Sequence, residues 1–345
     1  MSSSFKATSA PNARSLTDGV ELSENVVMPW VGFGTYRLGG KTKSYQKTLE
    51  ALQVGYRAID TAFIYGGEKT EQEVGSALQK AFKDDVLSRD EVFVITKHWR
   101  KYHGYESTLK CLNLSLRRLQ LDYVDLYLMH WPGPAWTTMN RKKELIQKFG
   151  KWHYAATPQQ DMVRLRAETW RAMEDALKEG KVRAIGVSNF TIQHLETLKQ
   201  TATTWPPAVN QVECHPLYPQ QELLEYCQKE GIVLQAYSAF GGQDASKAQW
   251  KELVGGTKMM DSPIIQTIAQ EVGRTPAQVL LRWALQRNCA VTPKTTSVER
   301  MKENANVFDF SLSEEQMKVL LEMEAPGSQG RLCWKRDPLR LMDFD

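Results

Sequence analysis

The chain has 345 residues, of which 42% are hydrophobic and 24% are charged, and its formal net charge is +4. These values are ordinary for a globular protein and exclude a disordered or fibrous chain. Basic residues are interleaved with acidic ones, and no apolar run reaches the roughly 18 residues of a membrane span, so we expect neither a nucleic-acid nor a membrane partner.

The first residues, 1–14, are rich in serine and contain two basic residues but no acidic one. This composition favours a disordered tail over an organelle transit peptide, which it also resembles. The pair Asp18–Gly19 stands within the alternating stretch 15–22 and predicts the turn of a β-hairpin. We therefore expect a single folded domain over residues 15–345 that opens with this hairpin.

Beyond the hairpin, eight short runs rich in β-forming residues alternate with segments that have the period of a helix. Most of the runs are nearly continuous in apolar residues, as strands covered on both faces must be. Helix-period segments such as 107–120 and 220–231 separate them. The eight runs are residues 30–36, 56–62, 92–99, 123–131, 182–190, 207–215, 232–240 and 289–295.

This alternation suits two α/β folds, an open doubly wound sheet and a closed barrel. The open sheet usually carries a GxGxxG phosphate turn after its first strand. Residues 32–40, GFGTYRLGG, lack that spacing, and eight repeats fit the closed form. The expected fold is therefore an α/β, (β/α)8 TIM barrel with an N-terminal β-hairpin and an extra C-terminal helix and loop.

Polar side chains follow the ends of the predicted strands, where barrels of this kind place their active sites. Asp60 and Tyr65 follow the second run, Lys97 ends the third, and His130 ends the fourth. A carboxylate keeps a buried lysine protonated, and a nearby ammonium lowers the pKa of a phenol. His130 can hydrogen-bond an oxygen placed beside that phenol. The four residues predict proton donation from Tyr65 to a carbonyl oxygen.

Reduction of a carbonyl also needs a hydride, which a nicotinamide supplies and no side chain does. Residues at later strand ends suit such a ring. Ser188, Asn189 and Gln211 can hydrogen-bond its carboxamide, and Tyr237 can stack on one face. We therefore expect a nicotinamide cofactor at this end of the barrel.

The segment after the eighth run is suited to a phosphate. Lys294 and Thr295 precede a predicted helix start, and Arg300 lies on the first turns of that helix. A phosphate there would meet two cations and free backbone N–H groups. This arrangement favours the 2′-phosphate of NADP over NAD.

Three segments resemble, in order, the signatures of the aldo-keto reductase superfamily: GYRAIDTA with Tyr65, RAIGVSNF (183–190) and PKTTSVERMKEN (293–304). The resemblance runs from about residue 15 to the end and indicates an aldose- or aldehyde-reductase-like member that binds NADP(H). It implies the catalytic set Asp60, Tyr65, Lys97 and His130. It implies cofactor contacts from Thr35, Tyr36, Ser188, Asn189, Gln211, Tyr237, Ser238, Phe240, Lys294, Thr295, Arg300, Glu303 and Asn304.

Within that cofactor set, the resemblance assigns Ser238 to the pyrophosphate and Glu303 and Asn304 to the adenine. The chain departs from the family after Tyr65, where GGEKTEQEVG forms a longer turn. The length of this turn affects where the Tyr65 hydroxyl points. Residues 241–256 carry two glycine pairs and are expected to form a mobile strap over the cofactor.

The substrate pocket is expected to have a largely apolar wall around the carbonyl. Two loops, 133–167 and 325–345, are expected to set specificity, and both are basic. Their basic residues favour charges that are simply solvated over charges that bind an acidic substrate. Either interpretation is compatible with the sequence. The residues expected to form the wall are Tyr36, Ile64, Trp99 and Trp131.

The sequence thus predicts a monomeric, cytoplasmic, NADPH-dependent reductase of small aldehydes or ketones without a metal. The five cysteines have no CxxC or zinc spacing and read as free thiols in a reducing compartment. His98 and His103 favour a surface pair over a metal site. The alternatives are a non-enzymatic NADP-binding regulatory or structural subunit of the same fold, and a barrel lyase forming a Schiff base through Lys97 or Lys294.

Overall fold

The centre of the molecule is a sheet of eight parallel strands in which each strand pairs with the next along the chain. All eight strands fall within the eight predicted runs. The computed structural model describes residues 5–38, 43–133, 159–242 and 246–333. The strands are β4 (Phe33–Gly34), β5 (Ala58–Asp60), β6 (Phe93–His98), β7 (Val124–Met129), β8 (Val182–Ser188), β9 (Val209–Glu213), β10 (Val233–Tyr237) and β11 (Ala290–Val291).

The sheet closes on itself because its first and last strands also pair. Val31, just before β4, forms a parallel bridge with Val291 in β11. The backbone N–H of Gly34 donates to the carbonyl oxygen of Pro293 at 3.0 Å. A Cβ on Gly34 would lie 2.8 Å from the carbonyl oxygen of Thr292, so this close seam requires glycine. The predicted (β/α)8 barrel is confirmed.

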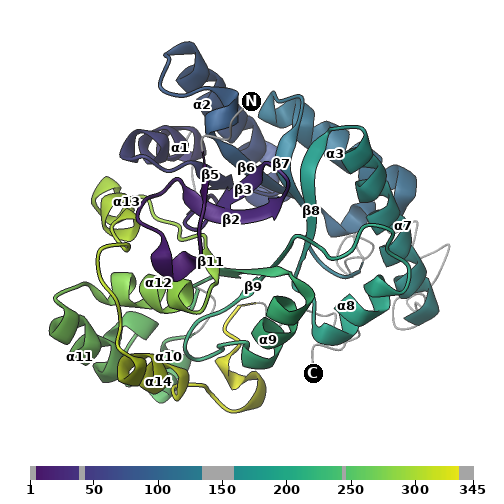
Figure 1. The fold of residues 1–345 in the computed structure, drawn as a ribbon. Coiled ribbons are helices and arrows are strands. Elements are labelled where there is room, and N and C mark those ends of the chain that lie inside the picture. Colours follow the sequence, from purple (N-terminus) through teal and green to yellow (C-terminus); the bar gives the residue numbers. More distant parts are fainter. Residues whose placement is uncertain (1–4, 39–42, 134–158, 243–245, 334–345) are drawn as a thin grey trace.

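Helices form a ring around the strands, as Figure 1 shows. The predicted helical segments 107–120 and 220–231 correspond to α3 and α9, and α14 is the extra C-terminal helix. No helix in the described ranges is long and apolar enough to cross a membrane. The helices are α1 (Lys43–Val54), α2 (Lys69–Lys83), α3 (Tyr105–Leu119), α7 (Gln159–Lys178), α8 (Ile192–Lys199), α9 (Gln221–Glu230), α10 (Lys247–Val254), α11 (Pro263–Val272), α12 (Pro276–Gln286), α13 (Val298–Ala305) and α14 (Glu314–Leu321).

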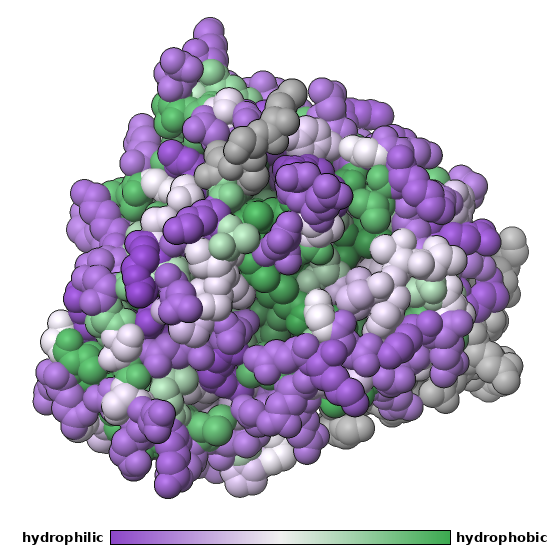
Figure 2. Space-filling model, in the orientation of Figure 1, coloured by the Kyte–Doolittle hydropathy of each residue, from purple (hydrophilic) through white to green (hydrophobic). Residues whose placement is uncertain are grey.

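The core fills the barrel and the space between the strands and the helices. Residues of β6 and β7 are buried along their whole length, as expected when helices cover the outer face of a barrel and side chains fill its interior. Figure 2 shows a mainly hydrophilic outer surface, with hydrophobic residues gathered in the hollow in the middle of the visible face. All five cysteines are buried, and the described part of the chain contains no disulfide.

The N-terminal hairpin is present, but its turn is not where the sequence placed it. Asp18–Gly19 begins β2 (Asp18–Ser23), and the chain turns at Asn25, whose φ is 61°, before β3 (Val26–Pro29). A Cβ on Gly19 would lie 2.2 Å from the carbonyl oxygen of Met28 on the opposite strand. Gly19 is thus explained by close strand approach rather than by a turn.

The N-terminal segment differs from the predicted disordered tail. Lys6–Ala7 forms β1, which pairs in parallel with β2. Phe5 is 8% exposed, and the indole N–H of Trp30 donates to the carbonyl oxygen of Thr8 at 3.0 Å. The serine-rich composition does not indicate this ordered segment, because a single aromatic residue and backbone pairing are enough to hold a short segment against the barrel.

Replacing Phe5 by Ala should lower the free energy of unfolding by about 2 kcal/mol, because the buried ring loses its apolar contacts. Replacing the exposed neighbour Lys6 by Ala should change it by less than about 0.5 kcal/mol. Urea unfolding followed by circular dichroism measures both. Equal, negligible effects would mean that the segment is not packed.

Candidate active site

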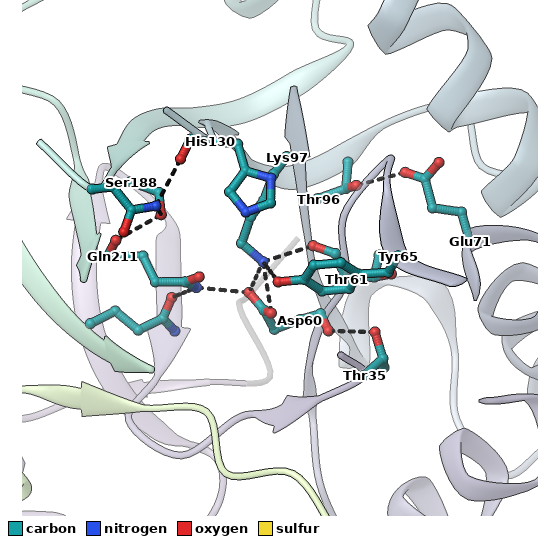
Figure 3. Close-up of polar contacts among 12 residues, drawn as sticks. Thr35, Asp60, Thr61, Tyr65, Glu71, Thr96, Lys97, His130, Ser188 and Gln211 are labelled. Carbon is teal, nitrogen blue, oxygen red and sulfur yellow. Dashed lines mark hydrogen bonds and ion pairs between the residues drawn. The ribbon is translucent and has the colours of Figure 1, made fainter. Parts of the chain in front are cut away.

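The four residues of the predicted catalytic set meet at one end of the barrel (Figure 3). Asp60 is the last residue of β5, Lys97 lies in β6, and His130 directly follows β7. Because the strands are parallel, their carboxyl ends share one rim. Tyr65 reaches the same rim from the turn after β5.

Lys97 is a fully buried ammonium surrounded by hydrogen-bond acceptors. Its Nζ donates to both carboxylate oxygens of Asp60 at 2.7 Å and to the carbonyl oxygen of Thr61 at 2.8 Å. The hydroxyl of Tyr65 lies 3.3 Å from the same nitrogen. Burial lowers the pKa of Lys97, and the Asp60 carboxylate opposes this by stabilising the charged form.

The longer turn after Tyr65 does not direct the phenol away from Lys97. Tyr65 begins a short 3-10 helix that ends at Glu68, and within it Gly66 and Gly67 have φ values of 59° and 64°. Glycine adopts this left-handed conformation without steric cost. The two glycines therefore complete the turn and leave the hydroxyl in contact with the ammonium.

The pKa of the Tyr65 phenol lies well above its usual value. Burial is the main cause, followed by the negative charge of Asp60 and by Tyr36. The net shift is therefore upward, opposite to the lowering by Lys97 that the sequence predicted. The phenol is therefore protonated at neutral pH, which is the state that a proton donor requires.

His130 faces the phenol as a neutral imidazole. Its ring centroid lies 6.0 Å from that of Tyr65, with an interplanar angle of 76°. Burial lowers the pKa of His130 well below its ordinary value, and the charges of Lys97 and Arg100 lower it further. A neutral imidazole offers one N–H and one acceptor nitrogen, so it can hydrogen-bond an oxygen beside the phenol.

The residues predicted to hold a nicotinamide lie beside this set and are hydrogen-bonded to one another. Asn189 donates from Nδ2 to the carbonyl oxygen of His130 at 2.9 Å, and its Oδ1 accepts from the Tyr237 hydroxyl at 2.7 Å. Ser188 donates from Oγ to the backbone oxygen of Gln211 at 2.7 Å. Asn189 has a φ of 62°, a conformation that asparagine tolerates better than most residues.

Gln211 also contacts the Asp60–Lys97 ion pair, and through Gln211 the structure reveals a buried residue that the sequence analysis did not single out. Its Nε2 donates to Oδ2 of Asp60 at 2.8 Å and to Oε1 of Gln235 at 2.7 Å. Gln235 lies in the middle of β10 and is fully buried. The sequence feature that could have indicated Gln235 is its position as a glutamine inside the otherwise apolar run VLQAY.

The predicted phosphate residues gather at the start of α13. Lys294 is half-buried and Thr295 buried, and Arg300 is exposed on the first turn of the helix. Burial lowers the pKa of Lys294, and the positive charge of nearby Arg37 lowers it further. Two neighbouring cations beside a helix N-terminus favour binding of an anion.

The other cofactor candidates take part in contacts within the protein. Glu303 accepts from the Thr275 hydroxyl at 2.6 Å, and Asn304 beside it is 3% exposed. Thr35 donates from Oγ1 to the backbone oxygen of Asp60 at 2.9 Å and so supports the end of β5. Phe240 is half-buried in the turn after β10.

Ser238 contacts the C-terminal segment, which is held by a second residue that the sequence did not reveal. Cys333 Sγ donates to Ser238 Oγ at 3.1 Å. Glu213, at the end of β9, accepts the backbone N–H groups of Leu332 at 2.7 Å and Cys333 at 3.0 Å. The sequence did contain one indication of Glu213: it is a carboxylate at a predicted strand end that has no part in the predicted chemistry.

Aromatic rings line the space around the phenol and the imidazole. The ring centroid of Tyr36 lies 4.9 Å from that of Tyr65. The centroids of Trp99 and Trp131 lie 5.9 Å and 6.2 Å from that of His130. Ile64 is half-buried directly before Tyr65, so the four residues predicted for the substrate wall all lie close to the reacting groups: Tyr36, Ile64, Trp99 and Trp131.

Parts of the predicted loops lie outside the described residues. These parts are 134–158 of the first specificity loop, 243–245 of the strap, and 334–345 of the second specificity loop. The roles predicted for these loops stay predictions.

The two histidines next to the site are buried, so the predicted surface pair is wrong. Their ring centroids lie 4.8 Å apart, and His103 Nδ1 lies 3.1 Å from Thr169 Oγ1. His98 directly follows Lys97 in β6, and neither of its ring nitrogens has a hydrogen-bond partner among the described residues. Burial lowers the pKa of His98 to about 4.

A family model described as "Aldo/keto reductase family" matches residues 30–325. The chain belongs to the aldo/keto reductase family. This aldo/keto reductase is 39% identical over 303 residues to a glyoxal reductase of Bacillus subtilis (strain 168), with 88% of this chain and 91% of that protein covered. It is 40% identical over 306 residues to estradiol 17 beta-dehydrogenase 5 of Mus musculus, with 87% and 90% covered.

A solved structure gives the same result for the fold. An aldo-keto reductase of Bombyx mori in complex with NADP superposes on this aldo/keto reductase with a TM-score of 0.72 and 30% sequence identity, covering 88% of this chain and 92% of that one. The resemblance inferred from the three sequence signatures is thus confirmed over most of the chain.

The buried His98 should make the stability of this aldo/keto reductase depend on pH. Its pKa is about 4 when folded and about 6.5 when unfolded, so the unfolded chain binds the proton first and stability falls as the pH drops from 6.5 towards 4. Between pH 7 and pH 5 the variant His98→Leu should lose about 2 kcal/mol less than the wild type. Urea unfolding at both pH values measures this, and equal losses would contradict it.

Proposed function

We propose that this aldo/keto reductase is an NADPH-dependent reductase that converts small aldehydes or ketones to alcohols, with Tyr65 as the proton donor. The observation that carries the proposal is the contact of the Tyr65 hydroxyl with the buried Lys97 ammonium, which Asp60 holds. The relatives support the class of reaction, since one is a glyoxal reductase and the Bombyx mori enzyme is complexed with NADP.

The chemistry divides between cofactor and protein. When bound, NADPH supplies the hydride that reaches the carbonyl carbon. Tyr65 gives the proton of its hydroxyl to the carbonyl oxygen, and the negative charge that develops on the phenol oxygen lies 3.3 Å from the Lys97 ammonium. That charge is stabilised only as the proton leaves, so the ammonium favours the transition state over the resting phenol.

His130 and the aromatic wall position the substrate. The neutral imidazole can donate one hydrogen bond to the carbonyl oxygen, which places that oxygen next to the phenol. The rings of Tyr36, Trp99 and Trp131 give the carbonyl an apolar surround, which keeps water from competing for these hydrogen bonds.

The residues present fit NADP(H) on the chemistry of their donor groups. Lys294 and Arg300 supply two cations at the N-terminus of α13, and Lys294 already lies against the like charge of Arg37. A phosphate at this position would relieve that repulsion and accept charge-assisted hydrogen bonds. The cations would therefore hold the 2′-phosphate. The nicotinamide would be held by Ser188, Asn189, Gln211 and Tyr237.

The geometry disfavours a lyase that acts through Lys97, and it disfavours a non-enzymatic subunit. A Schiff-base lyase needs an amine with a free lone pair, whereas Lys97 Nζ donates to Asp60 and to the Thr61 carbonyl oxygen. A non-enzymatic NADP-binding subunit has no need for a buried ion pair in contact with a phenol. The complete set therefore supports an enzyme.

Replacing Tyr65 by Phe should lower kcat for a reactive aldehyde by about 100-fold or more, because the ring stays while the proton donor is lost. NADPH consumption at 340 nm measures the rate, and calorimetric titration checks that NADPH still binds. The control Tyr105→Phe removes a hydroxyl that bonds Asp175 on α7, outside the predicted catalytic set, and should turn over normally. Normal turnover by the Tyr65 variant would rule out the assigned role.

Replacing Lys294 by Met should weaken NADPH binding by about 10-fold or more, because a charge-assisted bond to the 2′-phosphate is lost. NADH lacks that phosphate, so its dissociation constant should change by less than about 2-fold. Lys302→Met removes an exposed charge from the same helix and serves as the control. An equal loss for both cofactors would argue against a 2′-phosphate contact.

A further inference from the structure

We propose that Gln235 is a positioning residue that fixes which end of the Gln211 side-chain amide faces the nicotinamide subsite. The subsite then presents a hydrogen-bond acceptor and selects the N–H group of the cofactor's carboxamide. This inference rests on the proposed function, because it concerns how the nicotinamide is held. It gives a role to a buried side chain that does not reach the substrate.

The contacts form one line of buried polar groups across the barrel. Gln235 Oε1 lies 2.7 Å from Gln211 Nε2, which in turn lies 2.8 Å from Asp60 Oδ2. The same carboxylate binds Lys97, the neighbour of Tyr65, as Figure 3 shows. The line crosses four strands, β10, β9, β5 and β6, which pack their inward-facing side chains together.

The direction of each hydrogen bond in this line follows from the carboxylate. An ionised Asp60 has no proton to donate, so the NH2 group of Gln211 must face it. The second N–H of that group then faces Gln235 Oε1. Both N–H groups of Gln211 are thus committed, and its Oε1 accepts no hydrogen bond from any described residue. That oxygen is the part of the amide left for a ligand.

The neighbouring side chains are committed as well. Asn189 donates from Nδ2 to the His130 carbonyl oxygen and to Ser188 Oγ, and its Oδ1 accepts from the Tyr237 hydroxyl. Ser188 gives its hydroxyl proton to the backbone of Gln211. Gln211 Oε1, which accepts from no described residue, is therefore the oxygen of this group that is most open to a carboxamide N–H.

Gln235 makes this arrangement at the expense of its own hydrogen bonds. Its NH2 group faces Met28 Sδ at 3.8 Å, and a thioether is a weak acceptor. Its orientation is thus set by the needs of Gln211 rather than by its own best partners. Without Gln235 Oε1, one N–H of Gln211 would be buried without a partner, and rotation of that amide would become favourable.

The test compares the affinity of two probes for the purified full chain by calorimetric titration. One probe is NADP⁺, and the other is its analogue with an acetyl group in place of the carboxamide, which has no N–H to donate. Wild type should bind NADP⁺ about 5-fold to 10-fold more tightly than the analogue. In Gln235→Leu this ratio should fall below about 2-fold.

Two variants separate positioning from packing. Gln235→Glu keeps an acceptor for Gln211 and should keep the wild-type ratio. Leu234→Val disturbs the neighbouring core position on β10, which is 1% exposed, without touching the line of amides, and should also keep the ratio. If Gln235→Leu fails to fold, Gln235→Met replaces it, because methionine matches the shape of glutamine and offers only a weak acceptor.

The outcomes are distinct. A ratio near one in the wild type, or an unchanged ratio when the acceptor is removed, overturns the inference while leaving the proposed function intact. A fall of the ratio in Leu234→Val as large as that in Gln235→Leu overturns it as well, since packing would then explain the effect. Failure of the wild type to bind NADP⁺ refutes the proposed function instead.

Discussion

A positive charge inside a protein is unstable unless a negative charge and hydrogen-bond acceptors surround it, and the barrel is organised around one such charge. The ammonium of Lys97 is buried against the carboxylate of Asp60. The register of the sheet brings them together, because Asp60 pairs with Ile95 on β6 and Lys97 lies two residues further on the same face. The ion pair is therefore a product of parallel strand pairing, and Tyr65 needs only a short turn to reach it.

In the proposed mechanism the same charges connect proton donation to cofactor binding. Asp60 accepts hydrogen bonds from Lys97 on one side and from Gln211 on the other. Through these contacts a change in the amide line would reach the carboxylate and then the ammonium that we propose stabilises the Tyr65 phenolate as it forms. The nicotinamide subsite and the acid are thus parts of one buried network, in which effects of single substitutions are not expected to add.

Much of the fold and of the candidate site could be predicted from the sequence, because a polar residue after an apolar run marks the end of a strand. Asp60, Lys97 and His130 each close an apolar run, and closure of the barrel turns that linear pattern into a shared rim. The failures have physical reasons. Asp18–Gly19 has the composition of a turn, yet its glycine serves a close strand contact, and Phe5 holds a segment that looks disordered. Gln235 and Glu213 act through partners distant in sequence, and the net pKa of Tyr65 depends on burial, which spacing along the chain does not report.

The way in which Glu213 holds the C-terminal segment has an evolutionary consequence. Its carboxylate accepts main-chain N–H groups of Leu332 and Cys333, and every residue except proline carries such a group. This main-chain part of the attachment therefore does not depend on which side chains stand at these two positions, whereas the Cys333 thiol adds a contact with Ser238 that does. Over evolution, any residue except proline can therefore replace Leu332 or Cys333 without loss of these two main-chain hydrogen bonds to β9.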